Sequence, residues 1–238
     1  MIFARRLAFL LLLGTAMLSA DEPAILGYTE PYRTITVSAS EQGVISEMLV
    51  EEGTATKKGQ VLARLDTASF QAELDIAKAE TKLQATRLKR LEELSAANRS
   101  TPEELDRART DLVIKEAQVR RIEAQIETRT LRSPVDGIVT EIKRDPSEAV
   151  SASNPHVLTV VQVDKLILNL FLPPARAATF QVGATVNLKL LEEKVTTPGK
   201  VEFVSPITDS ASGTVRVKFV IENADGAHRS GGRCTLAE

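Results

Sequence analysis

The spacing of apolar residues changes twice along this chain. Between residues 33 and 66 apolar and polar residues alternate in short runs, as in Thr34-Ile35-Thr36-Val37, and glycines interrupt the runs. Residues 67–129 contain no glycine and a single proline, and are rich in Ala, Leu, Glu, Lys, Arg and Gln. From Leu131 onward the alternating pattern returns. Alternation is typical of strands and the middle composition of helices, so the pattern predicts a helical block inserted between two β blocks.

The helical block breaks once, at residues 98–102. Thr101 can cap a helix, Pro102 suits the first helical position, and Glu104 stands where the acid of a capping box belongs. The sequence therefore predicts one helix over about 67–97 and a second over 102–129. At 1.5 Å per residue, each is roughly 40–45 Å long.

Both predicted helices carry an apolar stripe with heptad spacing. In the second helix the stripe consists of Leu105, Ala108, Leu112, Val119, Ile122 and Ile126. The stripe of the first helix is weaker, being interrupted by Thr81 and Gln84, and consists of Phe70, Leu74, Ala77, Leu88 and Leu91. Because neither helix can bury its stripe alone and the connection is short, we expect an antiparallel coiled-coil hairpin.

The C-terminal β block has short strands separated by turn signals. Strands are expected over 166–172, 184–191, 199–205 and 214–221 and in the last run, 230–236, with a short helical turn over Ala175–Phe180. Such regular spacing is typical of a small barrel, predicted here for residues 165–238. The single cysteine, Cys234, is expected as a strand residue near the end.

The N-terminus has the pattern of a secretory signal peptide, predicted for residues 1–20. Arg5 and Arg6 precede an apolar run from Leu7 to Leu18, which is followed by Ser19-Ala20 and two acids. The run is short for a membrane span, which takes about 20 apolar residues, and an uncleaved anchor is the alternative. Since no cysteine follows the run, the pattern excludes a lipoprotein.

Composition argues against several classes of function. The net charge of -2 does not favour nucleic acid as a partner. One cysteine and two histidines, far apart in sequence, do not easily supply a metal site. The acidic residues are scattered, and no nucleophile and base are clustered. We therefore expect neither an enzyme nor a bound cofactor.

Two segments of the β blocks share a motif of glycine followed by an alternating strand. The first contains Gly43, Gly53 and Gly59, and Gly53 and Gly59 are expected to supply turn conformations closed to other residues. The second reads Ser133-Pro134-Val135-Asp136-Gly137-Ile138-Val139, with Pro134 and Gly137 as turn residues.

These segments resemble the split biotinyl/lipoyl domain of the periplasmic adaptor, or membrane fusion protein, family (HlyD-like, RND efflux type). The resemblance implies a mixed α and β, elongated, multi-domain fold. It implies that residues 33–66 and 130–163 form a lipoyl-like barrel-sandwich hybrid and that the α-hairpin of residues 67–129 is inserted into it. Residues 165–238 are expected to form the β-barrel, where Val201–Pro206 with Asp209 and Thr214 is similar to a family stretch. The family's membrane-proximal domain is expected to be absent.

The resemblance also implies a binding site at the hairpin tip. Arg90, Leu94 and Thr101 match the family's Arg-Leu-Ser spacing, with Thr101 in place of Ser. In the family these residues dock on an outer-membrane, TolC-like channel. Arg offers a planar multidentate donor, and Leu an apolar contact. Alternatively, the three residues have only structural roles: Arg90 is a solvated helix residue, Leu94 is the last residue of the apolar seam, and Thr101 caps the second helix. Thr101 is expected to serve both roles, because capping uses its oxygen and leaves the hydroxyl proton free.

The function implied by the resemblance is that of an adaptor for export of drugs or small molecules. It would link an inner-membrane transporter, RND-type or alternatively ABC-type, to the outer-membrane channel, in the periplasm of a Gram-negative bacterium. A ring of copies, commonly a hexamer, is implied, and Ile76 and Leu83 are candidates for contacts between neighbours. A lipoyl or biotin carrier is a further alternative. However, the helices stand where a carrier needs its acceptor lysine, and Lys57 and Lys58 lie in another turn.

Overall fold

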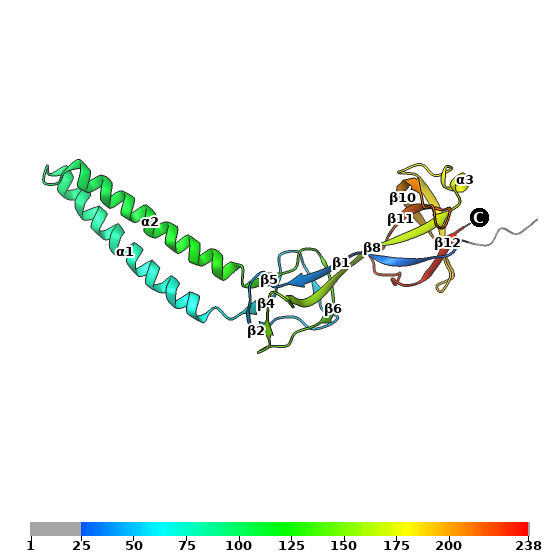
Figure 1. Cartoon of the computed structure of the whole chain (residues 1–238), viewed down its shortest axis with the longest axis horizontal. Helices are drawn as coiled ribbons and strands as arrows, with labels where there is room; N and C mark the ends of the chain where they lie inside the picture. Colours follow the sequence, from blue (N-terminus) through cyan, green and yellow to red (C-terminus); the bar gives the residue numbers. More distant parts are fainter. Residues whose placement is uncertain (1–24, 238) are drawn as a thin grey trace, which may run out of the picture.

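A computed structural model describes residues 25–237 and shows an elongated molecule of three modules in a row. A helical hairpin stands at one end, a β-sandwich in the middle and a β-barrel at the other end (Figure 1). The predicted signal peptide lies outside the described residues. Within residues 25–237, no helix is both long and apolar enough to cross a membrane.

The secondary structure follows the predicted order of β block, helices and β block. The first β block contains β1 (Gly27–Ser38), β2 (Gly43–Met48), β3 (Ala55–Thr56) and β4 (Val61–Leu65). The helices are α1 (Ala68–Ala96) and α2 (Pro102–Glu127). The second β block contains β5 (Thr130–Arg132), β6 (Gly137–Ile142), β7 (Ala149–Val150), β8 (His156–Leu172), α3 (Pro174–Ala177), β9 (Thr185–Leu190), β10 (Val195–Thr208), β11 (Val215–Glu222) and β12 (Arg233–Leu236).

The C-terminal module is a closed antiparallel barrel. Its strands pair in the order β1, β12, β9, β10, β11 and β8, and β8 pairs with β1 to close the ring. Buried leucines of β8, Phe219 and Cys234 fill the interior, and Phe180 meets the Phe219 ring edge-on at 5.6 Å. The predicted helical turn over 175–180 is shorter in the structure, because α3 ends at Ala177. The strand position of Cys234 is confirmed.

The sequence did not indicate that residues 27–31 belong to this barrel. Gly27 pairs with Cys234, and Thr29 pairs with Leu168. The hydroxyl oxygen of Thr29 accepts a hydrogen bond from Gly232 N at 3.1 Å. The barrel is therefore built from both ends of the described chain, and local spacing in a sequence cannot show such a pairing.

The middle module is a sandwich of two sheets. One sheet contains the ends of β1 and β8 nearest the hairpin, with β6 and β3, and the other has the order β5-β4-β2-β7. Their shared core includes Ile45, Leu62, Leu65, Val139 and Leu158. In the second sheet Val61 pairs with Arg132 and Arg64 with Thr130. The segments on either side of the helices thus meet, which confirms the predicted interrupted β module.

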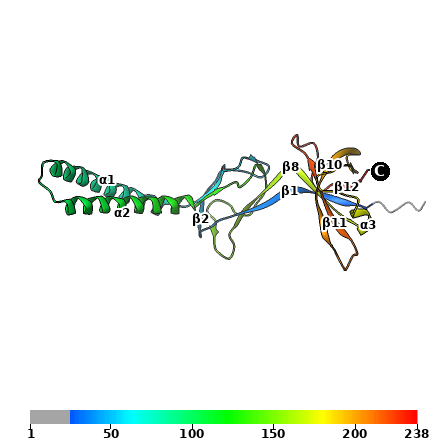
Figure 2. The same cartoon turned by 90° about the horizontal axis from the view of Figure 1, so that it is seen from above.

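Strands β1 and β8 run through both β modules (Figures 1 and 2). They pair from Thr29 opposite Leu168 to Ser38 opposite His156, with a register shift between Pro31 and Arg33. The predicted boundary between residues 163 and 165 falls inside β8. Val163, Asp164 and Lys165 contain no glycine or proline, so nothing in this stretch ends the strand. The sandwich and the barrel are therefore joined by a two-stranded ribbon, with a register shift at the junction.

The hairpin is held by a thin apolar seam and by ion pairs between its helices. Leu74, Ala77 and Ile122 form its buried cluster. Lys115 Nζ lies 2.7 Å from Glu80 Oε2, and the pairs Lys78–Glu123 and Arg109–Glu92 also join the helices. The two helices begin and end within two residues of the predicted positions.

Candidate functional site

The candidate site is the turn between α1 and α2 at the far end of the hairpin (Figure 2). Helix α1 ends in a Schellman motif, in which the N–H of Asn98 donates to Ser95 O at 2.9 Å and the N–H of Arg99 donates to Leu94 O at 2.8 Å. Asn98 takes the left-handed conformation that this motif requires, with φ of 56°. The turn is therefore fixed by backbone hydrogen bonds on its α1 side.

A capping box fixes the α2 side of the turn. The N–H of Glu104 donates to Thr101 Oγ1 at 3.2 Å, and the N–H of Thr101 donates to Glu104 Oε2 at 2.9 Å. These bonds confirm the capping box predicted from Thr101, Pro102 and Glu104. The hydrogen bonds from Thr101 hold the pKa of the Glu104 carboxyl below its usual value.

One prediction about Thr101 was wrong. Its hydroxyl lies 3.0 Å from Glu104 Oε2 and donates its proton to that carboxylate. The proton is therefore not free for a partner, because the carboxylate that completes the box is also the strongest acceptor in reach. A partner that binds the Thr101 hydroxyl has to compete with Glu104 for it.

The other two candidate residues are exposed on α1. Arg90 and Leu94 are four residues apart, so they lie on one face of the helix in consecutive turns. The Leu94 side chain is 37% exposed, whereas the seam residues Leu88 and Leu91 are partly buried. Arg90 has no ion-pair partner among residues 25–237. The structure thus presents an apolar and a cationic side chain close to the turn.

Arg99 is a feature of the tip that the sequence analysis did not single out. It is exposed at the turn itself, directly after the left-handed Asn98. Five cations of this region have no ion-pair partner in the described part of the chain, namely Arg87, Lys89, Arg90, Arg99 and Arg107, against two unpaired acids, Glu93 and Glu103. Glu92 is paired with Arg109, and Glu104 serves the capping box. The unused charge of the tip is therefore mainly positive.

The predicted motif residues of the sandwich divide into two groups. Gly53 and Gly59 lie in turns with φ of 87° and 84°, as expected. Gly43 and Gly137 are instead the first residues of β2 and β6, and Pro134 is exposed in the bend before β6. Gly43 and Gly137 therefore begin the strands that follow the bends at residues 40–41 and 134–136.

Gly137 nevertheless has a steric role. A Cβ there would lie 2.4 Å from the carbonyl oxygen of Val161, whereas a Cβ at Gly43 would meet Leu65 no closer than 3.5 Å. The strands β6 and β8 can therefore pair at this point only without a side chain at Gly137.

The lysines considered for a carrier function lie at the edge of the sandwich. Lys57 and Lys58 belong to a turn with Gly59, and the N–H of Lys58 donates to Asp136 Oδ1 at 2.7 Å. Nothing in their surroundings distinguishes them from ordinary solvated turn residues. Across residues 25–237, no three His, Cys, Asp or Glu side chains are grouped so that they could hold a metal ion.

Comparison with known proteins gives the same overall picture. A family model described as "RND MFP, barrel-sandwich hybrid domain" matches residues 33–162. Nodulation protein NolF of Rhizobium meliloti is 26% identical over 228 residues, which cover 89% of this chain and 62% of NolF. Efflux pump periplasmic linker BepD of Brucella suis is 27% identical over 222 residues, covering 81% of this chain and 56% of BepD. The chain thus spans little more than half the length of these relatives.

The arrangement of modules also recurs in a solved structure. A MacA-MexA chimeric protein that contains the Pseudomonas aeruginosa MexA α-hairpin domain superimposes with a TM-score of 0.76. The match covers 90% of this chain and 78% of the chimera, at 22% sequence identity. It shows the fold, with the hairpin inserted between two β segments as here.

Proposed function

The chain belongs to the RND membrane fusion protein family, and from this premise we propose that it is a periplasmic adaptor of an efflux pump rather than an enzyme. The adaptor would join an inner-membrane transporter to a TolC-like outer-membrane channel for export of drugs or small molecules. An RND-type transporter is favoured because the matched family model is of that type, and an ABC-type transporter is the alternative. The observation that carries the proposal is the hairpin inserted into the family's sandwich domain.

The shape of the molecule supports a bridging role. The hairpin projects from one end of the sandwich and the barrel from the other, so the two ends can meet different partners (Figure 1). Helix α1 alone, with 29 residues, reaches about 43 Å. We propose that the hairpin tip docks on the channel and that the barrel and sandwich contact the transporter and neighbouring copies.

We propose Arg90, Leu94 and Thr101 as the docking residues of the tip. Arg90 and Leu94 are exposed and uncommitted, which suits end-on contact with carbonyls, carboxylates and an apolar surface. Thr101 contributes mainly by holding the start of α2, since both of its hydroxyl functions are used within the capping box.

The test is charge reversal at Arg90. Arg90→Asp is expected to abolish co-purification with the TolC-like channel of the source bacterium and to leave the fold unchanged, because the side chain is exposed. Arg121→Asp is the matched control, since Arg121 is an exposed arginine of α2 that lies about 30 Å from Thr101 along the helix. Equal recovery of the channel with wild type and Arg90→Asp would refute the docking assignment.

Self-association into a ring, as a hexamer, is part of the proposal. Ile76 and Leu83 are 62% and 67% exposed and are seven residues apart, so they lie on one stripe of α1 outside the hairpin seam. Ile114 of α2 is 58% exposed. Large apolar side chains exposed on a thin hairpin are typical of a surface that another chain covers.

A further inference from the structure

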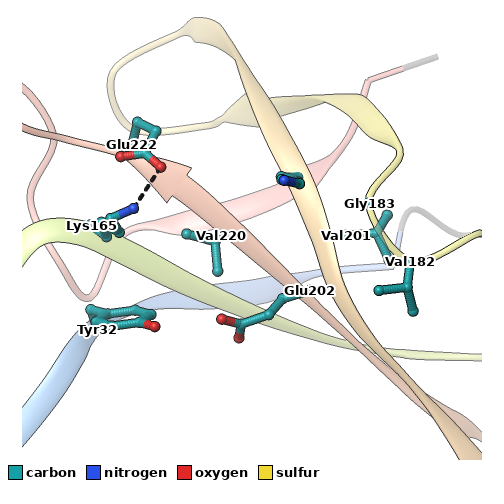
Figure 3. Close-up of a pocket in the computed structure, with 9 residues that line it drawn as sticks. Tyr32, Lys165, Val182, Gly183, Val201, Glu202, Val220 and Glu222 are labelled. Carbon is teal, nitrogen blue, oxygen red and sulfur yellow. Dashed lines mark hydrogen bonds and ion pairs between the residues drawn. The ribbon is translucent and has the colours of Figure 1, made fainter.

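The barrel has a groove on its outer surface, far from the hairpin tip. The groove has a volume of about 390 Å³ and is formed by strands β1, β8, β10 and β11 with the turn after α3. Tyr32, Glu202 and Val220 line its middle, and Val182 stands at one end (Figure 3). Volumes of this size are within the range of small-molecule sites.

The acidic groups of the groove are already paired. Glu222 Oε1 lies 2.9 Å from Lys165 Nζ at one end of the groove (Figure 3). Glu202 Oε2 lies 2.5 Å from Lys218 Nζ, which also approaches the Tyr32 ring to 5.9 Å from its centroid. Both carboxylates are thus neutralised by lysines of the neighbouring strands.

Two hydrogen-bond donors of the groove have no partner within residues 25–237. Lys200 is exposed and takes part in no ion pair, and the hydroxyl of Tyr32 takes part in no hydrogen bond. The polar groups of the groove that are free to bind a ligand are therefore hydrogen-bond donors. The unpaired charge among them, on Lys200, is positive. Such a site favours a ligand with an anionic, hydrogen-bond-accepting group.

The other part of the lining is apolar and held in place. Val182 is 66% exposed, yet its turn is pinned to β10, because Gly183 N donates to Val201 O and Val201 N donates to Ala184 O, both at 2.8 Å. Gly183 allows this turn with φ of 92°. An exposed valine on a fixed turn, in the same groove as Val220 and the Tyr32 ring, offers a preformed apolar surface to a ligand.

We propose that this groove binds a small amphipathic anion, with its acidic group at Lys200 and the Tyr32 hydroxyl and its apolar body between Val182 and Val220. Aromatic acids and fatty acids both have this chemistry. An aromatic acid would represent an exported compound, and a fatty acid would represent a compound derived from lipid. The proposal does not rest on docking at the hairpin tip, since the two sites are at opposite ends of the molecule.

Binding can be tested on the purified full chain with anilinonaphthalene sulfonate and laurate as separate probes, by calorimetry and by competition. We expect saturable binding of at least one probe and about tenfold weaker binding by Lys200→Glu, because an attraction becomes a repulsion. Lys189→Glu is the control with the same charge change on an exposed, unpaired lysine of β9. Val182→Asp should weaken binding, and Arg121→Asp should bind as wild type.

The two probes also separate the sources of the ligand. Binding of laurate alone would indicate a lipid-derived acid as the ligand, and binding of the sulfonate alone would indicate an aromatic compound. Competition between the two probes would show that they share one site. Failure of both probes to saturate would overturn the proposal. So would an equal loss in Lys200→Glu and Lys189→Glu, or equally tight binding of a cationic detergent.

Discussion

Gly137 shows how a single hydrogen atom in place of a side chain decides whether two strands can pair. Its Cα faces the carbonyl oxygen of Val161, at a distance that leaves no room for a methyl group. Gly43, at the equivalent place in the first motif, has such room. The two glycines look alike in the sequence, and only the approach of β8 distinguishes them.

This difference predicts opposite outcomes for two alanine substitutions. Gly137→Ala is expected to lower the free energy of unfolding by about 3 kcal/mol or more, because backbone has to move to accept the methyl group. Gly43→Ala is expected to change it by less than about 1 kcal/mol. Urea unfolding followed by strand-sensitive circular dichroism would measure both values, and equal losses would contradict this account.

A second prediction at this scale concerns the pH dependence of the hairpin tip. Hydrogen bonds from Thr101 lower the pKa of Glu104 in the folded state, so the contribution of the carboxylate is present above its unfolded pKa of about 4.5. This contribution to stability is lost as the pH falls through the lower pKa that Glu104 has in the folded state. In the wild-type protein, we expect hydrogen exchange of the backbone amides at the start of α2 to become faster as the pH falls through this acidic range.

Substitution of Thr101 provides the comparison. Thr101→Val removes the side-chain cap at a cost of about 1 kcal/mol and should reduce the acidic step in exchange without abolishing it, because the backbone N–H of Thr101 still donates to Glu104. Thr101→Ser should retain the full step. A step of unchanged size in Thr101→Val would show that Glu104 acts through other groups.

At the scale of elements, the hairpin depends on a seam only a few residues wide. Ile122 is 2% exposed and packs with Leu74 and Ala77, whereas Ile114 on the same helix is 58% exposed. Burial rather than residue type therefore determines what each isoleucine contributes to stability.

Alanine substitutions at these two positions test the seam. Ile122→Ala should destabilise the helices by about 2 kcal/mol, because it leaves a cavity between them, and Ile114→Ala should cost less than about 0.5 kcal/mol. Thermal unfolding followed by the helical circular dichroism signal distinguishes the two. Similar midpoints for both variants would mean that the hairpin does not rely on this seam.

The elements that local signals specify were predictable, and those that depend on distant partners were not. Thr101, Pro102 and Glu104 fixed the turn of the hairpin because capping involves residues three positions apart. The place of Gly27 in the barrel depends on Cys234, at the other end of the chain, and no local pattern reveals that pairing.

The same limit applies to the candidate sites. The positions of Arg90, Leu94 and Thr101 could be read from their spacing, but the use of the Thr101 proton by Glu104 is a matter of geometry. The groove on the barrel joins Tyr32 to Lys200 and Val220 across four strands, so no stretch of sequence contains it.

For the whole molecule, the proposed ring makes a prediction about neighbouring copies. A benzophenone attached at Leu83→Cys should crosslink to a second copy, because Leu83 lies on the exposed apolar stripe. The native Cys234 should not interfere, since it is fully buried and burial raises the pKa of its thiol to about 11. Gel electrophoresis after illumination would show a ladder of products.

The control is the same label at Thr110→Cys, an exposed polar position of α2. It should give much less product than the label at Leu83. Monomer alone from both positions, at concentrations where the pump assembles, would contradict a ring held through this stripe.

The continuity of β1 and β8 has a mechanical consequence. Because the same two strands belong to the barrel wall and to the sandwich, no loop separates the two modules, and the register shift between Pro31 and Arg33 is the irregular point of the connection. A tilt applied at the barrel would act on the hairpin as on a lever. Over an arm of about 43 Å, a tilt of about 10° displaces the far end by about 7 Å, more than one helical turn. Small movements of the barrel would in this way become large ones at the hairpin tip.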